Sequence, residues 1–503
     1  MSTIRKQGLI SSGVVYIGFA LGALNNLLFA RWLTTDQNGL AGMFVAIGNI
    51  IYPLASIGMP AFINKFYPYY KHHLAPEKND IMGFAFLLCG AACLLVLLGG
   101  FVIRPLVSQK FSSDSPLLVH YYAWLFPFGL GLSFLYVLEA YGWQVKRSIL
   151  TNFLRELLWR LLNTVLIFLF FFGILGSFDG FIKLYSLNYA VVAIVLCFFL
   201  LRKKELHLVF SISRVTKRFF SRIRSLVLLA WSANVLLNLS MYFAQLVIAA
   251  VVAGGLTPVA VFTMGQFVAS LITAPQRGVA AAAIAPLSQA WRDKNHARIE
   301  RIYRRSATNL LIFGVGIFVL IAINFRDGIL LFGLPKAYLA GESIFLLIGL
   351  NRVFDMGTGL NTQIIGTSVA WRFDFFTGMV LVTLTIPLNY ILAKHYGIVG
   401  PAIADLATFS IYNTIRCIFL YRKYGFQPFG RGTLYTVITG AVLYAACRWL
   451  FGAHSGLLWI SIRSCFFAVL YGGAVLALRL SEDVNPVWQT IRKRLGLRSD
   501  GTR

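Results

Sequence analysis

About fourteen apolar runs, each near twenty residues long, constrain this chain more than any other feature of its sequence. A helix of that length crosses roughly 30 Å of hydrocarbon, and the runs lack the two-residue alternation of a membrane barrel. The chain is 58% apolar and 13% charged, whereas a soluble protein carries about 25% charged residues. We therefore predict an all-α integral membrane protein. The predicted spans are 9–32, 40–62, 81–103, 117–140, 157–175, 180–201, 226–252, 259–287, 307–324, 337–360, 375–393, 399–420, 433–451 and 457–478.

The basic residues indicate how the chain is oriented in the membrane. The net charge is +27, and most Lys and Arg fall on one side when the N-terminus is placed in the cytoplasm. The segments 202–224 and 291–305 show this enrichment clearly. We expect both termini to be cytoplasmic and the positive charge to set orientation and contact anionic lipids. Nucleic acid is not an expected partner.

Two similar turns suggest an internal repeat. "FFGILGSFDGF" follows the fifth span and "HYGIVGPAIAD" follows the eleventh, each with a G-I-[LV]-G turn. Pro53 and Pro275 then correspond as well. The pattern predicts two parallel six-helix repeats around a central cavity, which is a transporter architecture. The predicted parts are an N-terminal lobe (1–201), a cytoplasmic basic linker (202–225), a C-terminal lobe (226–420), two appended helices (433–478) and a basic cytoplasmic tail (479–503).

A polar stripe with an arginine interrupts the eighth span, in "SLITAPQRGVAAAAIAP" (270–286). Gln266, Thr273 and Arg277 share one helical face there because they are spaced by seven and four residues. A charge in this position is costly in lipid, so the stripe should face protein or water. Pro275 removes a backbone donor and should bend the helix.

Other predicted spans carry similar polar positions. They can line a cavity, or they can join helices through hydrogen bonds and ion pairs such as Arg352 with Asp355. Arg416 and Glu139 lie near predicted helix ends, where we expect them to reach toward the membrane surface. The cavity candidates are Arg277, Arg352, Gln266, Thr273, Asn234, Asn238, Tyr242, Gln245 and Asn26, and the candidate ion-coupling acids are Asp355 and Asp405.

Several chemistries find no support in the sequence. There is no GxxxxGK[ST] motif for nucleotide hydrolysis and no HExxH motif. None of the six cysteines forms a CxxC pair, and no histidine has a metal-ligand spacing. We expect no catalytic residue, metal or cofactor. A membrane glycan polymerase or ligase would need a large outer loop, and the predicted outer loops are short.

The segments "LLFARWLTTDQNGLAGMF" (27–44) and "YGIVGPAIAD" (396–405), together with the order of loops along the whole chain, resemble one family. It is the polysaccharide transporter (O-antigen flippase-like) family of the multidrug/oligosaccharidyl-lipid/polysaccharide (MOP) exporter superfamily. The resemblance implies two six-helix lobes around a cavity, an inner-membrane location and movement of lipid-linked glycans from the inner to the outer leaflet. It thereby implies a polyprenyl pyrophosphate-linked oligosaccharide as cargo, a role in cell-surface polysaccharide or lipopolysaccharide assembly, and polysaccharide-assembly proteins as partners.

An anionic pyrophosphate suits a cavity with arginine and amide groups. A multidrug or cation exporter of the same superfamily is the alternative, and it would favour an acidic cavity. Neither the glycan nor the driving ion follows from the sequence.

Overall fold

The computed structural model describes residues 3–370 and 372–481, and its regular structure in those ranges is entirely helical. This confirms the predicted all-α membrane fold. Eleven helical segments within the described ranges are long and apolar enough to span a membrane. That count leaves the predicted number of fourteen open, because the segment Arg372–Tyr424 counts once although it contains two predicted spans. The predicted tail lies outside the described residues from 482 onward.

The chain forms two compact units, Met1–Ala260 and Val261–Arg503. The helix Arg214–Val251 therefore belongs to the first unit. The predicted lobe and linker boundaries remain predictions about the internal repeat.

The first unit contains ten α-helices within its described residues. They are α1 (Thr3–Trp32), α2 (Thr35–Ser56), α3 (Met59–His73), α4 (Ile81–Phe111), α5 (Pro116–His120), α6 (Leu125–Gln144), α7 (Ser148–Asn152), α8 (Trp159–Phe171), α9 (Phe178–Arg202) and α10 (Arg214–Val251), with 3-10 turns at Pro76–Lys78 and Tyr122–Trp124 and a π-helical turn, η3, at Phe153–Leu158.

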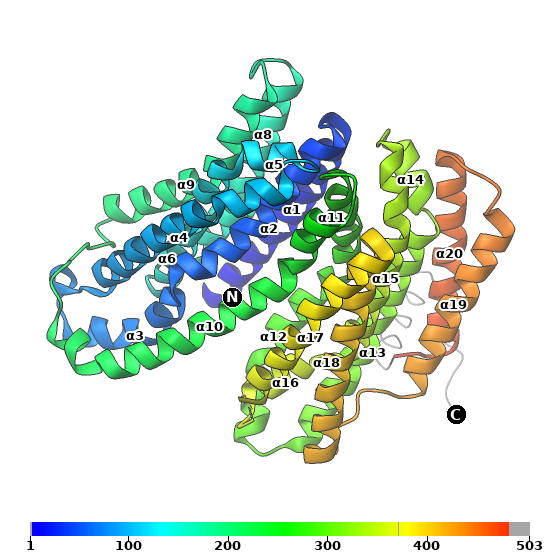
Figure 1. Ribbon diagram of the computed structural model, residues 1–503. Helices are drawn as coiled ribbons and strands as arrows, with labels where there is room; N and C mark the ends of the chain where they lie inside the picture. Colours follow the sequence, from blue (N-terminus) through cyan, green and yellow to red (C-terminus); the bar gives the residue numbers. More distant parts are fainter. Residues whose placement is uncertain (1–2, 371, 482–503) are drawn as a thin grey trace. The chain divides into compact units, whose positions relative to one another are not determined.

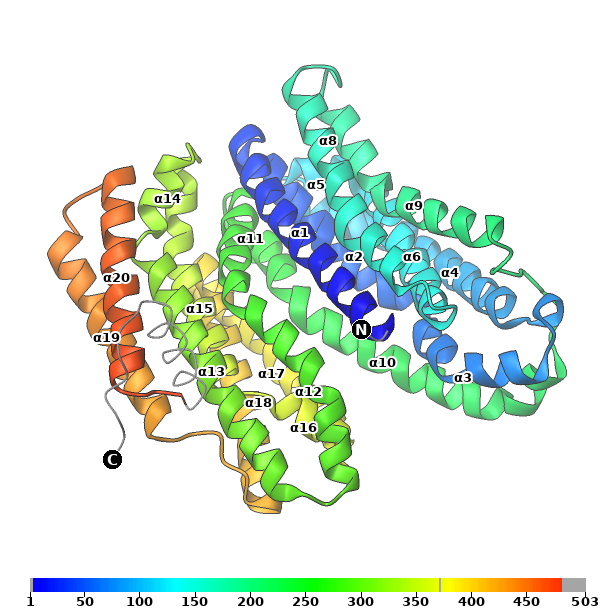
Figure 2. The same cartoon turned by 180° about the vertical axis from the view of Figure 1, so that it is seen from behind.

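Helix α6 is the centre of this unit, packed between α2 and α9 (Figure 1). Small residues allow the close approach that membrane helices use. A Cβ on Gly48 of α2 would lie 2.4 Å from the ring of Phe128, and one on Gly131 of α6 would lie 2.5 Å from the backbone nitrogen of Ala190. Figure 2 shows α1 on another side of the unit, where it packs beside α8.

The segment between α9 and α10 is anchored to the turns around it. The Asp80 carboxylate, which precedes α4, accepts hydrogen bonds from the Ser213 backbone N–H (2.8 Å) and the Thr216 hydroxyl (2.6 Å) at the start of α10. Arg147 forms an ion pair with Glu205, and this hydrogen-bonded contact raises the pKa of Arg147 above its usual value. These contacts hold the basic segment against the unit.

The second unit also has ten helices in its described part, the first of which starts just before the boundary. They are α11 (Thr257–Ser270), α12 (Ala274–Arg292), α13 (His296–Ala322), α14 (Phe325–Leu331), α15 (Gly341–Gly357), α16 (Asn361–Thr367), α17 (Arg372–Tyr396), α18 (Gly400–Tyr424), α19 (Arg431–Phe451) and α20 (Leu457–Ala477), with 3-10 turns at Leu271–Thr273, Lys336–Ala340 and Gly397–Val399.

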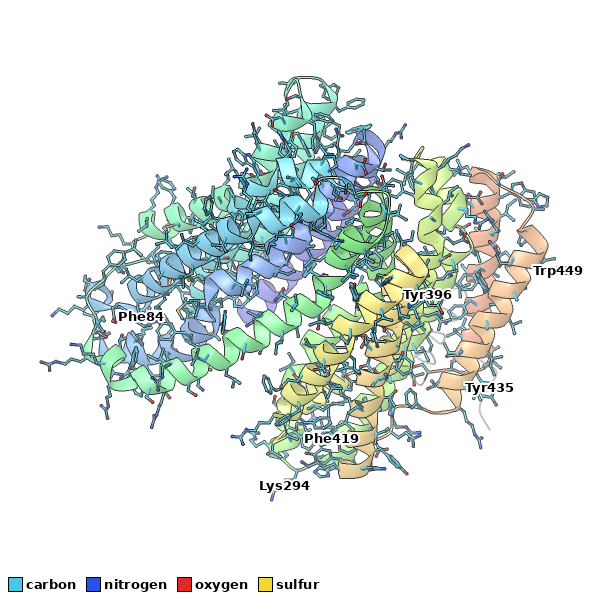
Figure 3. All side chains as sticks on the ribbon, viewed as in Figure 1. Phe84, Lys294, Tyr396, Phe419, Tyr435 and Trp449 are labelled. Carbon is cyan, nitrogen blue, oxygen red and sulfur yellow. The ribbon has the colours of Figure 1, made fainter. Side chains whose placement is uncertain are left out.

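Helix α13 connects the parts of this unit, because it packs against α12, α15, α19 and α20. Gly440 allows α19 to approach it, since a Cβ there would lie 2.2 Å from the side chain of Val315. Figure 3 shows Tyr435 and Trp449 on the outer side of α19, and both are exposed. An exposed apolar and aromatic face of this kind is what lipid-facing helices present.

The eighth predicted span consists of two α-helices with a 3-10 turn between them. Helix α11 ends at Ser270, a 3-10 turn covers Leu271–Thr273, and α12 begins at Ala274 with Pro275 in its first turn. Proline fits the first turn of a helix because its missing N–H would have no partner there. The sequence predicts a bend at Pro275, and the structure has a 3-10 turn just before this proline.

Candidate functional site

A group of polar side chains lies inside the first unit, and we call it the N-terminal polar cluster. It consists of Asn25, Glu139, Arg155, Glu156, Arg160 and Thr164. The Arg155 guanidinium pairs with the Glu139 carboxylate at 2.9 Å and with that of Glu156 at 3.0 Å. Arg160 pairs with Glu156 at 2.6 Å. Two acids and two bases therefore balance within one cluster.

Local backbone geometry places these charges. Arg155 and Glu156 lie in η3, a π-helical turn between α7 and α8, and such turns are frequent at functional sites. The amide of Asn25 on α1 donates to the Arg160 carbonyl at 2.8 Å and accepts from the Thr164 hydroxyl at 2.7 Å. The cluster therefore joins α1, α6 and α8.

Glu139 is the most buried ion of this cluster, with 2% of its surface exposed. Its Oε2 accepts from Arg155, while its Oε1 accepts no hydrogen bond within the described part of the chain. The prediction that Glu139 reaches the membrane surface is wrong, because its carboxylate is buried and paired with Arg155 inside the unit.

A second group, the C-terminal polar cluster, consists of Gln276, Asp355, Asn361, Asp374, Asn413 and Arg416. Asp355 of α15 accepts hydrogen bonds from Gln276 of α12 at 3.0 Å and Asn413 of α18 at 3.1 Å. The Asn413 oxygen in turn accepts from Asn361 at 3.1 Å. Asp355 thus connects three helices.

Arg416 is 1% exposed and contacts several polar and aromatic side chains. It pairs with Asp374, donates to the Thr362 hydroxyl at 2.6 Å and stacks over the ring of Tyr412 at 4.0 Å. The prediction that Arg416 reaches the membrane surface is therefore wrong too. A buried guanidinium needs this many partners to offset the loss of its hydration.

Arg352 and Asp405 form a smaller group on α15 and α18. The Asp405 carboxylate lies within electrostatic range of Arg352 and beside Asn389 of α17. The Arg352 guanidinium lies 6.0 Å from the ring centre of Phe409. Among the ion pairs of the described residues there is none between Arg352 and Asp355, so the structure favours Asp405 as the acid near Arg352.

The predicted polar stripe on α10 makes mainly local contacts. The amides of Asn234 and Asn238 donate to carbonyls one turn earlier, both at 2.9 Å, as Asn26 does on α1 at 2.8 Å. Tyr242 is partly buried and Gln245 is buried. The first unit therefore does not gather these residues into its N-terminal polar cluster.

The residues of the eighth predicted span lie around the helix break. Thr273 is in the 3-10 turn and donates to the Ser270 carbonyl at 3.0 Å, while Gln266 is half-buried on α11. Arg277 is exposed on α12, one residue after Gln276. The charge singled out by the sequence thus lies next to the amide that contacts Asp355.

Sequence reasoning missed most members of the two polar clusters. Gln276, Asn361 and Asn413 are uncharged amides in three different predicted spans or turns, and nothing in their spacing indicates that they belong together. The acids and bases of "LRELLWR" (154–160) resemble a membrane-surface segment before the fifth span. Within the described residues, no group of three or more His, Cys, Asp or Glu side chains could ligate a metal ion.

These features define a class of protein: a multi-pass, all-helical membrane protein with charged residues buried inside its helix bundles, as transporters have. No protein-family model matches the chain, and no curated protein matches it in sequence.

Several solved structures are similar to this fold. A lipid II flippase, MurJ, in an inward closed conformation is similar with a TM-score of 0.74 and 14% identity, covering 93% of this chain and 98% of that one. An inward-facing multidrug resistance transporter of the MATE family in the MOP superfamily has a TM-score of 0.65 and 17% identity, over 86% and 96%. A MOP superfamily transporter from Pyrococcus furiosus, whose binding pocket is described as having reverse polarity, has a TM-score of 0.56 and 16% identity, over 84% and 96%. The chain therefore shares the fold of these solved structures.

Proposed function

We propose that this protein is a flippase that moves a lipid-linked oligosaccharide from the inner to the outer leaflet of the cell's inner membrane by alternating access. The fold supports an exporter of the MOP type. The structural likeness to a lipid II flippase extends over 93% of the chain. The likeness to MATE-type transporters extends over 83 to 86%.

The observation that carries this proposal is the position of Arg277. It lies on a membrane-spanning segment, Thr257–Arg292, and its side chain is exposed. An arginine at the centre of a helix in lipid costs on the order of 3 kcal/mol. We infer that Arg277 instead faces an aqueous path, where a guanidinium suits the two phosphates of a polyprenyl pyrophosphate.

The remaining predicted cavity residues suit a sugar. Asn234, Asn238, Tyr242 and Gln245 on α10, with Asn26 on α1, offer amide and hydroxyl groups, and Gln266 and Thr273 do so beside the helix break. Such groups recognise hydroxyl-rich headgroups by hydrogen bonding. Arg352 is the second candidate for the pyrophosphate.

Asp355 and Asp405 are the proposed coupling groups. Gln276 donates to Asp355 and is the neighbour of Arg277 in the chain. A substrate that moved Arg277 would therefore shift the start of α12 and change the hydrogen bonding of Asp355. This connection gives a physical path from headgroup binding to the uptake or release of a proton or cation.

The experiment replaces Arg277 with Ala and with Lys in cells that depend on this protein for a surface glycan. Arg277→Ala should abolish glycan display and leave a lipid-linked intermediate in the inner leaflet, while Arg277→Lys should keep part of the activity because Lys lacks the planar fork. Arg292→Ala is the matched control, since that exposed arginine ends the same helix. Normal display by a well-expressed Arg277→Ala variant would refute the assigned role.

A multidrug or cation exporter is the second candidate, supported by the likeness to the MATE family transporter. It predicts that deletion of the gene raises sensitivity to cationic drugs without accumulation of any lipid-linked glycan. The same deletion strain therefore separates the two functions. Cytoplasmic termini and contact with polysaccharide-assembly proteins belong to the flippase proposal.

A further inference from the structure

A basic cavity of about 450 Å³ lies at one end of the second unit, between α13, the start of α19 and the residues that follow α20. We call it the arginine pocket. Its volume falls within the range of roughly 300 to 1,000 Å³ that small-molecule sites occupy. The charged residues that line it are Glu300, Arg301, Arg304, Arg305, Arg431 and Arg479.

The charge of this pocket is strongly positive, with five guanidinium groups and one carboxylate. Arg301 and Arg304 occupy one face of α13, because they are spaced by three residues. Like charges that are neighbours on a helix surface destabilise the helix. A ligand with several negative charges would relieve this repulsion.

The backbone around the pocket is closely packed. A Cβ on Gly432 would lie 2.6 Å from the Leu480 carbonyl oxygen, so the start of α19 touches the chain that follows α20. Ser481 donates to Asn309 and ties the same segment to α13. Three helices therefore fix the pocket walls.

Arg479 lies in the turn that closes α20. Its φ of 48° is in the left-handed region, and the Leu480 N–H donates to the Val475 carbonyl at 3.2 Å. This is the turn with which helices commonly end. This backbone turn ends α20 and leaves the exposed Arg479 side chain in the pocket lining.

The position of the pocket relative to the apolar parts of its helices indicates whether a lipid phosphate or a soluble phosphate fits it. On α19, Arg431 lines the pocket, while Leu434 and Tyr435 one turn later are exposed. Figure 3 shows Tyr435 on the outer side of this helix. On α13, the pocket ends at Thr308, just before the apolar part of the helix. The pocket thus lies where helices leave the hydrocarbon, at the level of lipid headgroups.

We propose that the arginine pocket binds an anionic phospholipid whose headgroup carries two phosphate groups. Arginine binds phosphate oxygens with paired, parallel hydrogen bonds, and basic pockets between membrane helices recognise doubly charged headgroups. The acyl chains then lie along the exposed face of α19. This site is independent of the cargo assigned to the protein.

The test is native mass spectrometry of the full chain, purified in detergent and titrated with a lipid of the cardiolipin type and, separately, with phosphatidylglycerol. The wild type should retain the two-phosphate lipid preferentially. The double variant Arg304→Ala/Arg431→Ala should bind it about 30-fold more weakly, given about 1 kcal/mol for each basic residue. Arg304→Lys/Arg431→Lys keeps both charges and should retain part of the binding.

Arg298→Ala is the matched control, because Arg298 is exposed on α13 but does not line the pocket. Binding should be unchanged in this variant. Equal losses in the control and the pocket variants would overturn the proposal, as would equal affinity for the two lipids. A third arm adds inorganic diphosphate: displacement of the lipid at equimolar concentration would assign the pocket to a soluble phosphate and overturn the lipid assignment. If the alanine variant does not fold, the lysine variant and the lipid comparison still decide the question.

Discussion

The ion pair between Arg463 of α20 and Asp327 of α14 offers a direct test of how buried charges hold the second unit together. The two side chains are 7% and 9% exposed. Arg463 also donates to the Trp459 carbonyl at 3.3 Å. Replacing Arg463 by Met keeps the length of the side chain and removes its charge, so Asp327 is left as a buried carboxylate without its ionic partner.

The expected loss of stability follows from that burial. Removing one partner of a buried ion pair costs about 3 to 5 kcal/mol, whereas replacing both partners by apolar residues is often neutral or stabilising. Arg463→Met should therefore be strongly destabilising. The double variant Arg463→Met/Asp327→Leu should recover most of the lost stability, because it leaves no unpaired charge.

The assay heats the detergent-solubilised protein and measures the temperature at which half of the monodisperse protein is lost. It compares this midpoint for the wild type, both single variants and the double variant. The order of the midpoints is the measured quantity, since a protein of this size need not unfold in one step. Arg448→Met is the control, because that arginine is 3.9 Å from Glu342 and its side chain is 45% exposed. A double variant as unstable as the sum of the two single variants would show that the pair is not energetically coupled.

Two further predictions concern the first unit. Gly83→Ala should destabilise the protein by about 1 to 3 kcal/mol, because the added Cβ would lie 1.9 Å from the Val209 carbonyl oxygen. Gly90→Ala on the same helix is the control and should be neutral, since no atom lies within 4 Å of its added Cβ. Equal melting temperatures of the two variants would contradict this packing. Asp80→Ala should speed trypsin cleavage of the segment between α9 and α10 several-fold, because it removes two hydrogen bonds that hold the start of α10. Glu77→Ala in the same turn should not, and unchanged cleavage of the Asp80 variant would refute the anchoring role.

The positions of the helices were largely predictable from the sequence. The final two predicted spans, 433–451 and 457–478, differ from α19 and α20 by no more than two residues at either end. This agreement has a physical cause: the bilayer sets one length for every span, and an apolar run of that length has few other structures available.

The buried polar contacts were much less predictable because they are long-range. Asp327 and Arg463 are separated by 136 residues, and Asp355 and Asn413 by 58. No helical periodicity connects residues so distant in sequence. The π-helical turn at 153–158 is also invisible to a pattern based on 3.6 residues per turn, so the spacing of Arg155 and Glu156 does not indicate the cluster that they form.

Helix α10 has a mechanical consequence of its own. Its 38 residues give a length of about 57 Å, nearly twice the roughly 30 Å of a bilayer's hydrocarbon. One continuous rod therefore runs from the Asp80 anchor through the membrane. A tilt of about 5° at the anchored end would displace the opposite end by about 5 Å. A small rearrangement among the turns near Asp80 would therefore move the residues that contact the far end of α10 by several times its own size.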